Sequence, residues 1–326
     1  MRQPPVFVVG MNGSGTTMML DCLNAHPELY GYPRETLIIP HYIANLASYG
    51  DLADDDRFEA LWNEFRNLSC FRWLNRGDPP PLPGDWRSRP RTLATIVDAT
   101  FHYYARNHGK DRWCEKTPMH AQHIAALSEL FPGACFVHMI RDGRSCAASF
   151  NRRWGYHPER TIYRWRNLIH TARAQAAASG ARYHEVFYER LTEDPEREMR
   201  QVCELLEVPF DPAVLTPGRP RVHTGQNERS ITRKASNWAG FFSPGRVRRL
   251  EHLAGGTLAD LGYDVPAGAR DHEPPRWRRR LWVLRDQLRL GWLLVWRSLT
   301  TPRERKWVDF RGRLQAAVRQ SRTTKD

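Results

Sequence analysis

Short apolar runs alternate with amphipathic stretches over the first two thirds of the chain. Residues 5–10 (PVFVVG) form a β-branched run that ends in glycine, and residues 14–24 follow with apolar side chains at helical spacing. After a Pro-Gly break the run recurs at 134–140 (ACFVHMI), and a third run at 183–188 precedes a helix-like stretch at 195–206. Strands that alternate with helices predict an α/β fold, a parallel sheet flanked by helices.

Two loops follow the first two of these strands. Residues 10–17 (GMNGSGTT) have the spacing GxxxxGTT, a P-loop frame in which Thr16 stands where a kinase or NTPase needs lysine. Glycines let backbone N–H groups approach an anion, and the next helix points its positive end at the same place. In the second loop, Arg141 and Ser149, eight residues later, can converge on one phosphate. The loops therefore predict a phosphate site at the carboxyl edge of the sheet.

The order and separation of these loops resemble the sulfotransferases that use 3′-phosphoadenosine 5′-phosphosulfate (PAPS). The resemblance is closest to tyrosylprotein sulfotransferases and their bacterial relatives, and it covers roughly residues 5 to 265. Further matching stretches are His26-Pro27, Glu35-Thr36, Trp113-Cys114-Glu115-Lys116-Thr117-Pro118, Phe187-Tyr188-Glu189-Arg190-Leu191, Asp194-Pro195, Ser236-Asn237-Trp238 and Leu261-Gly262-Tyr263-Asp264. The resemblance implies a P-loop-like sulfotransferase domain over residues 1–270. It also implies transfer of a sulfuryl group from PAPS to an acceptor hydroxyl, with PAP as the product.

The resemblance also assigns roles to individual positions. It implies that Glu35 is the base that takes the proton of the acceptor hydroxyl, and that Lys116 stabilises charge in the transition state. Ser236 matches a serine beside the reacting sulfate. The positions matched to cofactor binding are Gly13, Ser14, Gly15, Thr16 and Thr17 for the 5′-phosphosulfate, Arg141, Ser149 and Arg153 for the 3′-phosphate, and Tyr188 for the adenine side, with Arg233 and Lys234 as added cations.

Several of these positions also have a purely structural interpretation. Glu35 can form a surface salt bridge, Lys116 can be solvated, Tyr188 can belong to the core and Ser236 can cap a helix. Arg233 and the lysine after it can be a solvated pair.

Two places depart from the family's pattern. Gly13 stands where the family usually has Arg or Lys, so the cation at this place is supplied by Lys116 with backbone amides, is replaced by Arg34, or is missing. If it is missing, the alternative is a nucleotide-binding protein with reduced or lost transferase activity. A P-loop kinase is the other alternative, although Thr16 stands in place of its lysine. Leu37 and His41 occupy places where tyrosylprotein sulfotransferases have basic residues, which favours an acceptor less acidic than their peptides.

Composition and the first residues of the chain change the picture in four respects. The net charge is +13, but residues 1–270 hold 34 basic against 30 acidic groups, so the main body has little electrostatic support for nucleic-acid binding. The six cysteines are scattered and no Cys/His spacing is typical of a metal site, so no metal is expected. The first residues leave no room for a secretory leader, which predicts a cytoplasmic protein. Arg outnumbers Lys 44 to 5, which hints at a GC-rich bacterial genome and favours a small-molecule, glycan or lipid acceptor, while a tyrosine hydroxyl stays open.

The chain ends in a basic, Trp-rich extension, residues 271–326, with 15 basic against 6 acidic groups. Within it, residues 277–299 read as an amphipathic helix. Its apolar stripe consists of Trp277, Leu281, Leu284, Leu288, Trp292, Val295 and Leu299, and its predicted opposite face carries Arg278, Arg279, Arg280, Arg285 and Arg297. Three alternatives stay open for the stripe. It binds an anionic membrane surface, as in a protein peripheral to the inner membrane face, it packs on the catalytic domain, or it forms a homodimer.

Overall fold

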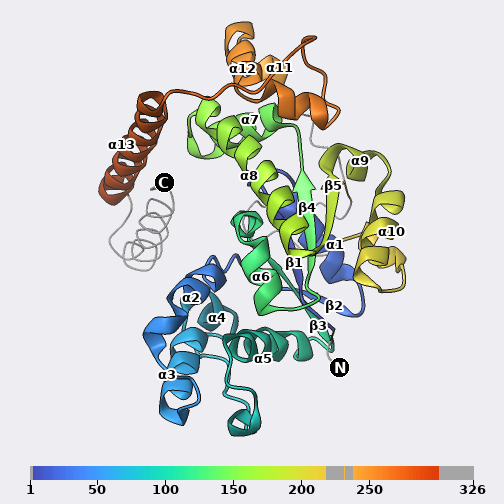
Figure 1. Ribbon diagram of the computed structural model, residues 1–326, viewed down its shortest axis with the longest axis vertical. Coiled ribbons are helices and arrows are strands. Elements are labelled where there is room, and N and C mark those ends of the chain that lie inside the picture. Colours follow the sequence, from blue (N-terminus) through green and yellow to red (C-terminus); the bar gives the residue numbers. More distant parts are fainter. Residues whose placement is uncertain (1–2, 218–230, 232–237, 301–326) are drawn as a thin grey trace.

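A five-stranded parallel sheet forms the centre of the molecule (Figure 1). The computed structural model describes residues 3–217, 231 and 238–300, and of residues 293–300 it describes only the backbone. The strands, in their order across the sheet, are β2 (Leu29–Gly31), β3 (Arg112–Lys116), β1 (Val6–Gly10), β4 (Cys135–Ile140) and β5 (Arg182–Phe187). This arrangement confirms the predicted α/β class, and it adds two strands, β2 and β3, that the sequence pattern did not predict.

Helices cover the sheet and form the two ends of the molecule (Figure 1). The α-helices are α1 (Thr16–Ala25), α2 (Ile39–Asn45), α3 (Asp55–Arg66), α4 (Ser69–Leu74), α5 (Leu93–Arg106), α6 (Ile124–Leu130), α7 (Gly143–Trp154), α8 (Pro158–Ser179), α9 (Tyr188–Glu193), α10 (Pro195–Leu206), α11 (Trp238–Phe241), α12 (Pro244–Asp260) and α13 (Arg276–Thr300). Short 3₁₀ helices span Leu46–Tyr49, Trp86–Ser88, Pro118–Gln122 and Pro212–Leu215. In Figure 1, α2 to α5 gather at one end of the molecule and α11 and α12 at the other. None of the described helices is long and apolar enough to cross a bilayer.

The two faces of the sheet bury two separate apolar cores. Side chains alternate along β1, so that Phe7 and Val9 join one core while Val6 and Val8 join the other. The first core is rich in aromatic rings and lies under α5, α6 and α8, and the second lies under α1 and α10. Because both faces are covered, every residue of β1, β3 and β4 is buried.

Local sequence signals set the ends of α10, which has the bounds that the sequence pattern predicts. The carboxylate of Asp194 accepts a hydrogen bond from the backbone N–H of Arg197, and Pro195 occupies the first helical turn. The helix ends where Glu207 adopts a left-handed conformation, with φ of 56°. Such signals at the helix ends allow the boundaries to be read from the sequence.

Candidate functional site

The first loop runs from β1 to α1 and depends on its glycines. Gly10, Gly13 and Gly15 all have positive φ, at 142°, 92° and 103°. A Cβ atom on Gly10 would lie 2.5 Å from the carbonyl oxygen of Met139, and one on Gly15 would lie 2.8 Å from Cδ2 of Tyr188. The loop is therefore held closely against β4 and the start of α9, where larger residues would collide.

The second loop follows β4 and meets the first. Nη1 of Arg141 donates a hydrogen bond to the carbonyl oxygen of Gly13 at 3.1 Å, and Nε1 of Trp165 donates to the carbonyl oxygen of Arg141 at 3.0 Å. Ser149 lies on α7, and a Cβ atom on Gly13 would lie 3.3 Å from its Oγ. Two residues that the sequence predicts for one phosphate, Arg141 and Ser149, thus converge on the first loop.

Tyr188 connects the two loops. Its side chain is buried in the second apolar core, and the guanidinium carbon of Arg141 lies 4.2 Å from the centre of its ring. The same ring faces Gly15. Tyr188 is therefore both a core residue and a wall of the loop region, and its role on the adenine side stays a prediction.

The first loop offers a buried donor to a ligand. Ser14 is fully buried, and its hydroxyl has no hydrogen-bond partner among the described residues. A buried hydroxyl left without a partner costs about 1–3 kcal/mol, so the site gains when an anion accepts from it. Thr16 is buried at the start of α1 and Thr17 is exposed. With backbone N–H groups at a helix N-terminus, these residues could hold the phosphosulfate of PAPS.

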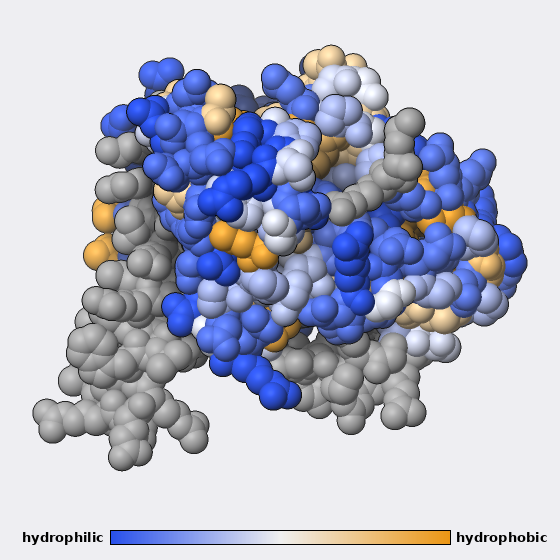
Figure 2. All heavy atoms as spheres, turned by 90° about the horizontal axis from the view of Figure 1, so that it is seen from below, coloured by the Kyte–Doolittle hydropathy of each residue, from blue (hydrophilic) through white to orange (hydrophobic). Residues whose placement is uncertain are grey.

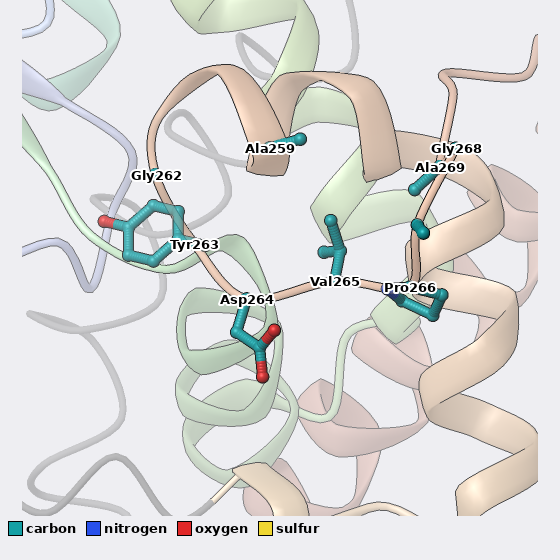
Figure 3. Close-up of a pocket in the computed structure, with 9 residues that line it drawn as sticks. Ala259, Gly262, Tyr263, Asp264, Val265, Pro266, Gly268 and Ala269 are labelled. Atoms are coloured by element: carbon teal, nitrogen blue, oxygen red, sulfur yellow. The ribbon is translucent and has the colours of Figure 1, made fainter.

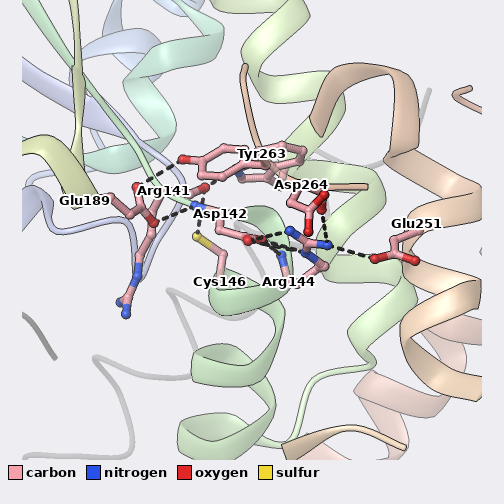
Figure 4. A network of polar contacts seen from close by, with 9 residues as sticks. Arg141, Asp142, Arg144, Cys146, Glu189, Glu251, Tyr263 and Asp264 are labelled. Carbon is pink, nitrogen blue, oxygen red and sulfur yellow. Dashed lines mark hydrogen bonds and ion pairs between the residues drawn. The ribbon is translucent and has the colours of Figure 1, made fainter. Parts of the chain in front are cut away.

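A polar network fixes the second loop at the start of α7 (Figure 4). The carboxylate of Glu189 accepts hydrogen bonds from the backbone N–H of Asp142 and from the hydroxyl of Tyr263, both at 3.1 Å. Arg144 is buried between Asp142 and Glu251, with ion-pair distances of 2.8 and 2.7 Å. Burial and the carboxylate of Glu189 raise the pKa of the Tyr263 phenol, which keeps it a hydrogen-bond donor. The sequence analysis gave none of these supporting residues a role.

A pocket beside this network is separate from the loops (Figure 3). Its lining consists of Ala259, Gly262, Tyr263, Asp264, Val265, Pro266, Ala267, Gly268 and Ala269. No predicted site residue in the described part of the chain belongs to this lining. Most of its side chains are small or apolar, so the pocket offers little chemistry of its own.

Glu35 and Lys116 form an ion pair near the sheet edge from which the two loops leave. Lys116 is the last residue of β3, and its Nζ donates to Oε1 of Glu35 at 2.6 Å. The lysine side chain is 8% exposed and the glutamate side chain 33% exposed. The two residues that the family resemblance assigns to catalysis are thus in direct contact, with the carboxylate on the solvent side.

Glu115 holds the segment that carries Glu35. Its fully buried Oε1 accepts hydrogen bonds from the backbone N–H and the hydroxyl of Thr36, at 3.3 and 3.0 Å, and from the hydroxyl of Thr117 at 2.5 Å. Nδ1 of His120 lies 3.0 Å from its other oxygen. Burial raises the pKa of Glu115, but His120 and the two hydroxyls outweigh it and hold that pKa below its usual range. In the sequence analysis Glu115 was only part of a matching motif.

The remaining predicted residues form no hydrogen bond or ion pair with the two loops or with the Glu35–Lys116 pair in the described part of the chain. Arg153 is exposed on α7, one helical turn after Ser149. Arg34 places its guanidinium 3.9 Å from the ring centre of Trp73, so in this structure it stacks on an aromatic side chain. The predicted positions Arg233, Lys234 and Ser236 lie outside the described residues. Within the described part of the chain no cluster of three or more His, Cys, Asp or Glu side chains could hold a metal ion.

Comparisons with known proteins point to one family. A model of the sulfotransferase family matches residues 4–212. Protein-tyrosine sulfotransferase A of Caenorhabditis elegans is 28% identical over 293 residues, which cover 83% of this chain and 70% of the relative. Human protein-tyrosine sulfotransferase 1 is 26% identical, over 83% of this chain and 73% of the relative.

Two solved structures are similar in fold. The sulfotransferase domain of the curacin biosynthetic pathway has a TM-score of 0.53 and 18% identity, and covers 82% of this chain and 100% of that domain. The sulfotransferase domain of the Synechococcus PCC 7002 olefin synthase has a TM-score of 0.51 and 22% identity, with 82% and 98% covered. The parallel sheet and its flanking helices are therefore a sulfotransferase fold.

Proposed function

Since the chain belongs to the sulfotransferase family, we propose that it transfers a sulfuryl group from PAPS to an acceptor hydroxyl. One observation carries the proposal: the ion pair of Glu35 and Lys116 and the two converging phosphate loops belong to neighbouring strands of one parallel sheet. β3 pairs directly with β1, which pairs with β4. The carboxyl ends of these strands therefore bring a base, a cation and a nucleotide site to the same edge.

The nucleotide is held by the loops. The first loop and Ser14 bind the 5′-phosphosulfate, and Arg141 with Ser149 binds the 3′-phosphate, with Arg153 adding charge from the next turn of α7. When bound, PAPS supplies the sulfuryl group: the acceptor oxygen bonds to sulfur while the bond from sulfur to the phosphate oxygen breaks, which leaves PAP. Because Gly13 carries no side chain, Lys116 and the backbone amides of the loop are left to supply the positive charge beside the 5′-phosphosulfate.

Glu35 accepts the proton of the acceptor hydroxyl. Among the described residues its Oε1 is engaged by Lys116, so Oε2 is the oxygen that takes the proton. Lys116 lies where negative charge develops on the transferred oxygens. The hydrogen bonds from Thr36 to Glu115 keep Glu35 in place during this step.

The acceptor is a hydroxyl compound, and we favour one that is not strongly acidic. The relatives are named protein-tyrosine sulfotransferases, which makes a tyrosine hydroxyl one candidate. Against an acidic peptide, Leu37 is exposed immediately after the Glu35-Thr36 pair, and His41 is exposed in the first turn of α2. Such a surface suits the hydroxyl of a small molecule, glycan or lipid better than an acidic peptide.

Calorimetric titration of the purified full chain with PAP tests the cofactor assignment, with ADP and ATP–Mg²⁺ as controls. We expect PAP to bind at least tenfold more tightly than ADP, because only PAP offers a phosphate to Arg141 and Ser149 at the 3′ position. Equal binding of PAP and ADP would contradict the assignment of the second loop.

A transfer assay then separates a working enzyme from a binding protein. PAPS carrying a ³⁵S label is incubated with the chain and a set of phenolic, sugar and lipid alcohols. Tight PAP binding without labelled product from any acceptor class would favour the alternative that Gly13 suggests, a nucleotide-binding protein that has lost transferase activity. Product formation that is abolished in the Glu35→Gln variant would support transfer at this site.

A further inference from the structure

Helix α13 is fixed to the body of the protein through one of its sides. The carboxylate of Asp286 accepts hydrogen bonds from the backbone N–H of His157, at 3.0 Å, and from Nη1 of Arg160, at 2.7 Å. Trp282 is buried and stacks on the ring of His157, with 5.6 Å between ring centres. These contacts fix which side of α13 faces α8 and which side faces away.

The side that faces away carries a stripe of large apolar side chains. Trp277, Leu281, Leu284 and Leu288 are each between 50% and 66% exposed. With 3.6 residues per turn they lie within a sector of about 60°, roughly 130–170° from the side that holds Trp282 and Asp286. We call these four residues the α13 stripe. Figure 2 shows hydrophobic side chains at the left margin of the molecule, where α13 lies in Figure 1.

Exposed arginines border the α13 stripe. Arg278 and Arg285 lie on one side of it and Arg280 on the other, about 70–90° from its centre. The sequence analysis placed these arginines opposite the stripe, and the structure corrects that: the opposite side packs on α8. The only acidic residue from 276 to 292, Asp286, is already paired with Arg160. The outward side of α13 is therefore apolar in the middle and cationic at both edges.

We infer that α13 docks in the plane of an anionic lipid bilayer, with the α13 stripe among the acyl chains and the bordering arginines on the headgroups. The arrangement is complementary in both shape and charge to such an interface, and a tryptophan in the stripe suits its boundary with water. The body does not cover the stripe, because Trp282 occupies the packed side instead. In a two-fold dimer through the stripe, the arginines of both copies would be brought together without compensating acids. This inference does not depend on sulfuryl transfer.

Co-sedimentation of the full chain with vesicles tests the inference. The vesicles are phosphatidylcholine alone, or phosphatidylcholine with phosphatidylglycerol in a 7:3 ratio. We expect binding to the anionic vesicles that exceeds binding to the neutral ones by at least tenfold and that weakens when salt is raised, because screening reduces the attraction to headgroups. Equal binding to the two vesicle types, or no binding to either, would overturn the inference.

Three variants identify the surface. The triple variant Leu281→Gln, Leu284→Gln, Leu288→Gln should lose at least tenfold in vesicle binding. The triple variant Arg278→Gln, Arg280→Gln, Arg285→Gln should lose about 100-fold on anionic vesicles only. Trp277 and Trp73 are both exposed and serve as a matched pair. Trp277→Gln should weaken vesicle binding, while Trp73→Gln should not. All substituted side chains are exposed, and unchanged thermal melting would show that the variants fold.

Light scattering distinguishes a second copy of the chain from a bilayer. If the leucine variant binds vesicles as well as the parent, the stripe is not the lipid surface and the inference fails. It also fails if the parent is a dimer that the leucine variant converts to a monomer, because the stripe is then a subunit interface.

Discussion

Nζ of Lys116 lies 2.6 Å from Oε1 of Glu35, although the two residues are 81 positions apart in the chain. The neighbouring residues make a second connection, in which the carboxylate of Glu115 accepts two hydrogen bonds from Thr36. Two consecutive residues at the end of β3 therefore bind two consecutive residues of the segment before α2. This double connection fixes both the position of the segment and the direction in which the Glu35 side chain leaves it.

Replacing Glu35 by glutamine tests its role as the base. The change keeps the size of the side chain and removes its ability to take a proton. We expect turnover of PAPS to fall by about 10²- to 10⁴-fold while the affinity for PAP stays within about threefold of the parent, because general-base catalysis acts on the chemical step. Steady-state kinetics and calorimetry measure the two quantities. Unchanged turnover would remove Glu35 from the reaction.

Replacing Glu115 by glutamine tests positioning through Thr36. The variant keeps one amide oxygen but removes the charge that His120 faces, so we expect the free energy of unfolding to fall by about 1–3 kcal/mol and turnover to fall with PAP affinity unchanged. If Glu115 acts through Glu35, the double variant Glu35→Gln, Glu115→Gln should be no slower than Glu35→Gln alone. Additive losses in turnover would mean that the two residues act independently.

Comparing Arg141 with Arg152 tests which arginine binds the 3′-phosphate. Both are arginines that lie over an aromatic ring, with Arg152 on α7 and 4.8 Å from the ring centre of Phe241. We expect Arg141→Ala to weaken PAP binding by about 10- to 100-fold, as the loss of a charge-assisted hydrogen bond predicts, and Arg152→Ala to change it by less than threefold. Calorimetry with PAP gives both constants. Equal effects would indicate a general loss of positive charge.

We predict that the backbone at Gly13 does not accommodate the Arg or Lys that the family resemblance leads one to expect there. Its φ of 92° is unfavourable for other residues, and a Cβ atom would lie 3.3 Å from Oγ of Ser149. We expect Gly13→Ala and Gly13→Arg each to lower the free energy of unfolding by about 1–3 kcal/mol in urea titrations. Parent-like stability in either variant would show that the loop adapts to a side chain here.

Glu159 should make stability depend on pH at the acidic end. It accepts hydrogen bonds from Arg246 and Arg249 of α12. Burial raises its pKa, but His157 and the two arginines outweigh this and lower the pKa to about 2. A carboxyl with a depressed pKa stabilises the fold fully above its unfolded value of about 4.3, and this contribution is lost as the pH falls toward 2.

Comparing Glu159→Gln with Glu196→Gln isolates that contribution. Glu196 forms an exposed pair with Arg200 on a single helix and serves as the control. At pH 7 we expect Glu159→Gln to lose about 1.5–3 kcal/mol of unfolding free energy and Glu196→Gln less than about 0.5 kcal/mol. The difference between the parent and Glu159→Gln should shrink between pH 4.5 and 2. A difference that is the same at pH 3 and pH 7 would contradict the lowered pKa.

The sequence pattern predicted β1, β4 and β5, and it missed β3, whose burial depends on distant partners, and the short β2. β1 and β4 stand out because their side chains are nearly all apolar. β3 does not, because Arg112, Glu115 and Lys116 are polar yet buried. Arg112, for example, donates to the carbonyl oxygen of Leu206, 94 positions away, and no local pattern reveals that partner. β2, with three residues, is too short to show a period.

Part of the candidate site could likewise be predicted from sequence spacing, and part could not. The spacing of Arg141 and Ser149 within one loop and one helix predicts that both can reach the same place, because a short segment of known structure has few arrangements. The contacts of Glu115 with Thr36, and of Glu189 with Tyr263, join positions 79 and 74 residues apart. These supporting contacts depend on how the sheet brings separate segments together, so sequence spacing cannot reveal them.

The double connection between β3 and the segment that carries Glu35 also bears on how acceptor preference can diversify. Immediately after Thr36 the backbone changes direction at Leu37, which has a φ of 57°. The residues from Leu37 to α5 follow Thr36, whose hydrogen bonds to Glu115 hold this segment on β3. Under the proposed function, insertions, deletions and new side chains in that stretch can therefore change the acceptor surface during evolution while Glu35 keeps its place, so the same reaction centre could act on different alcohols.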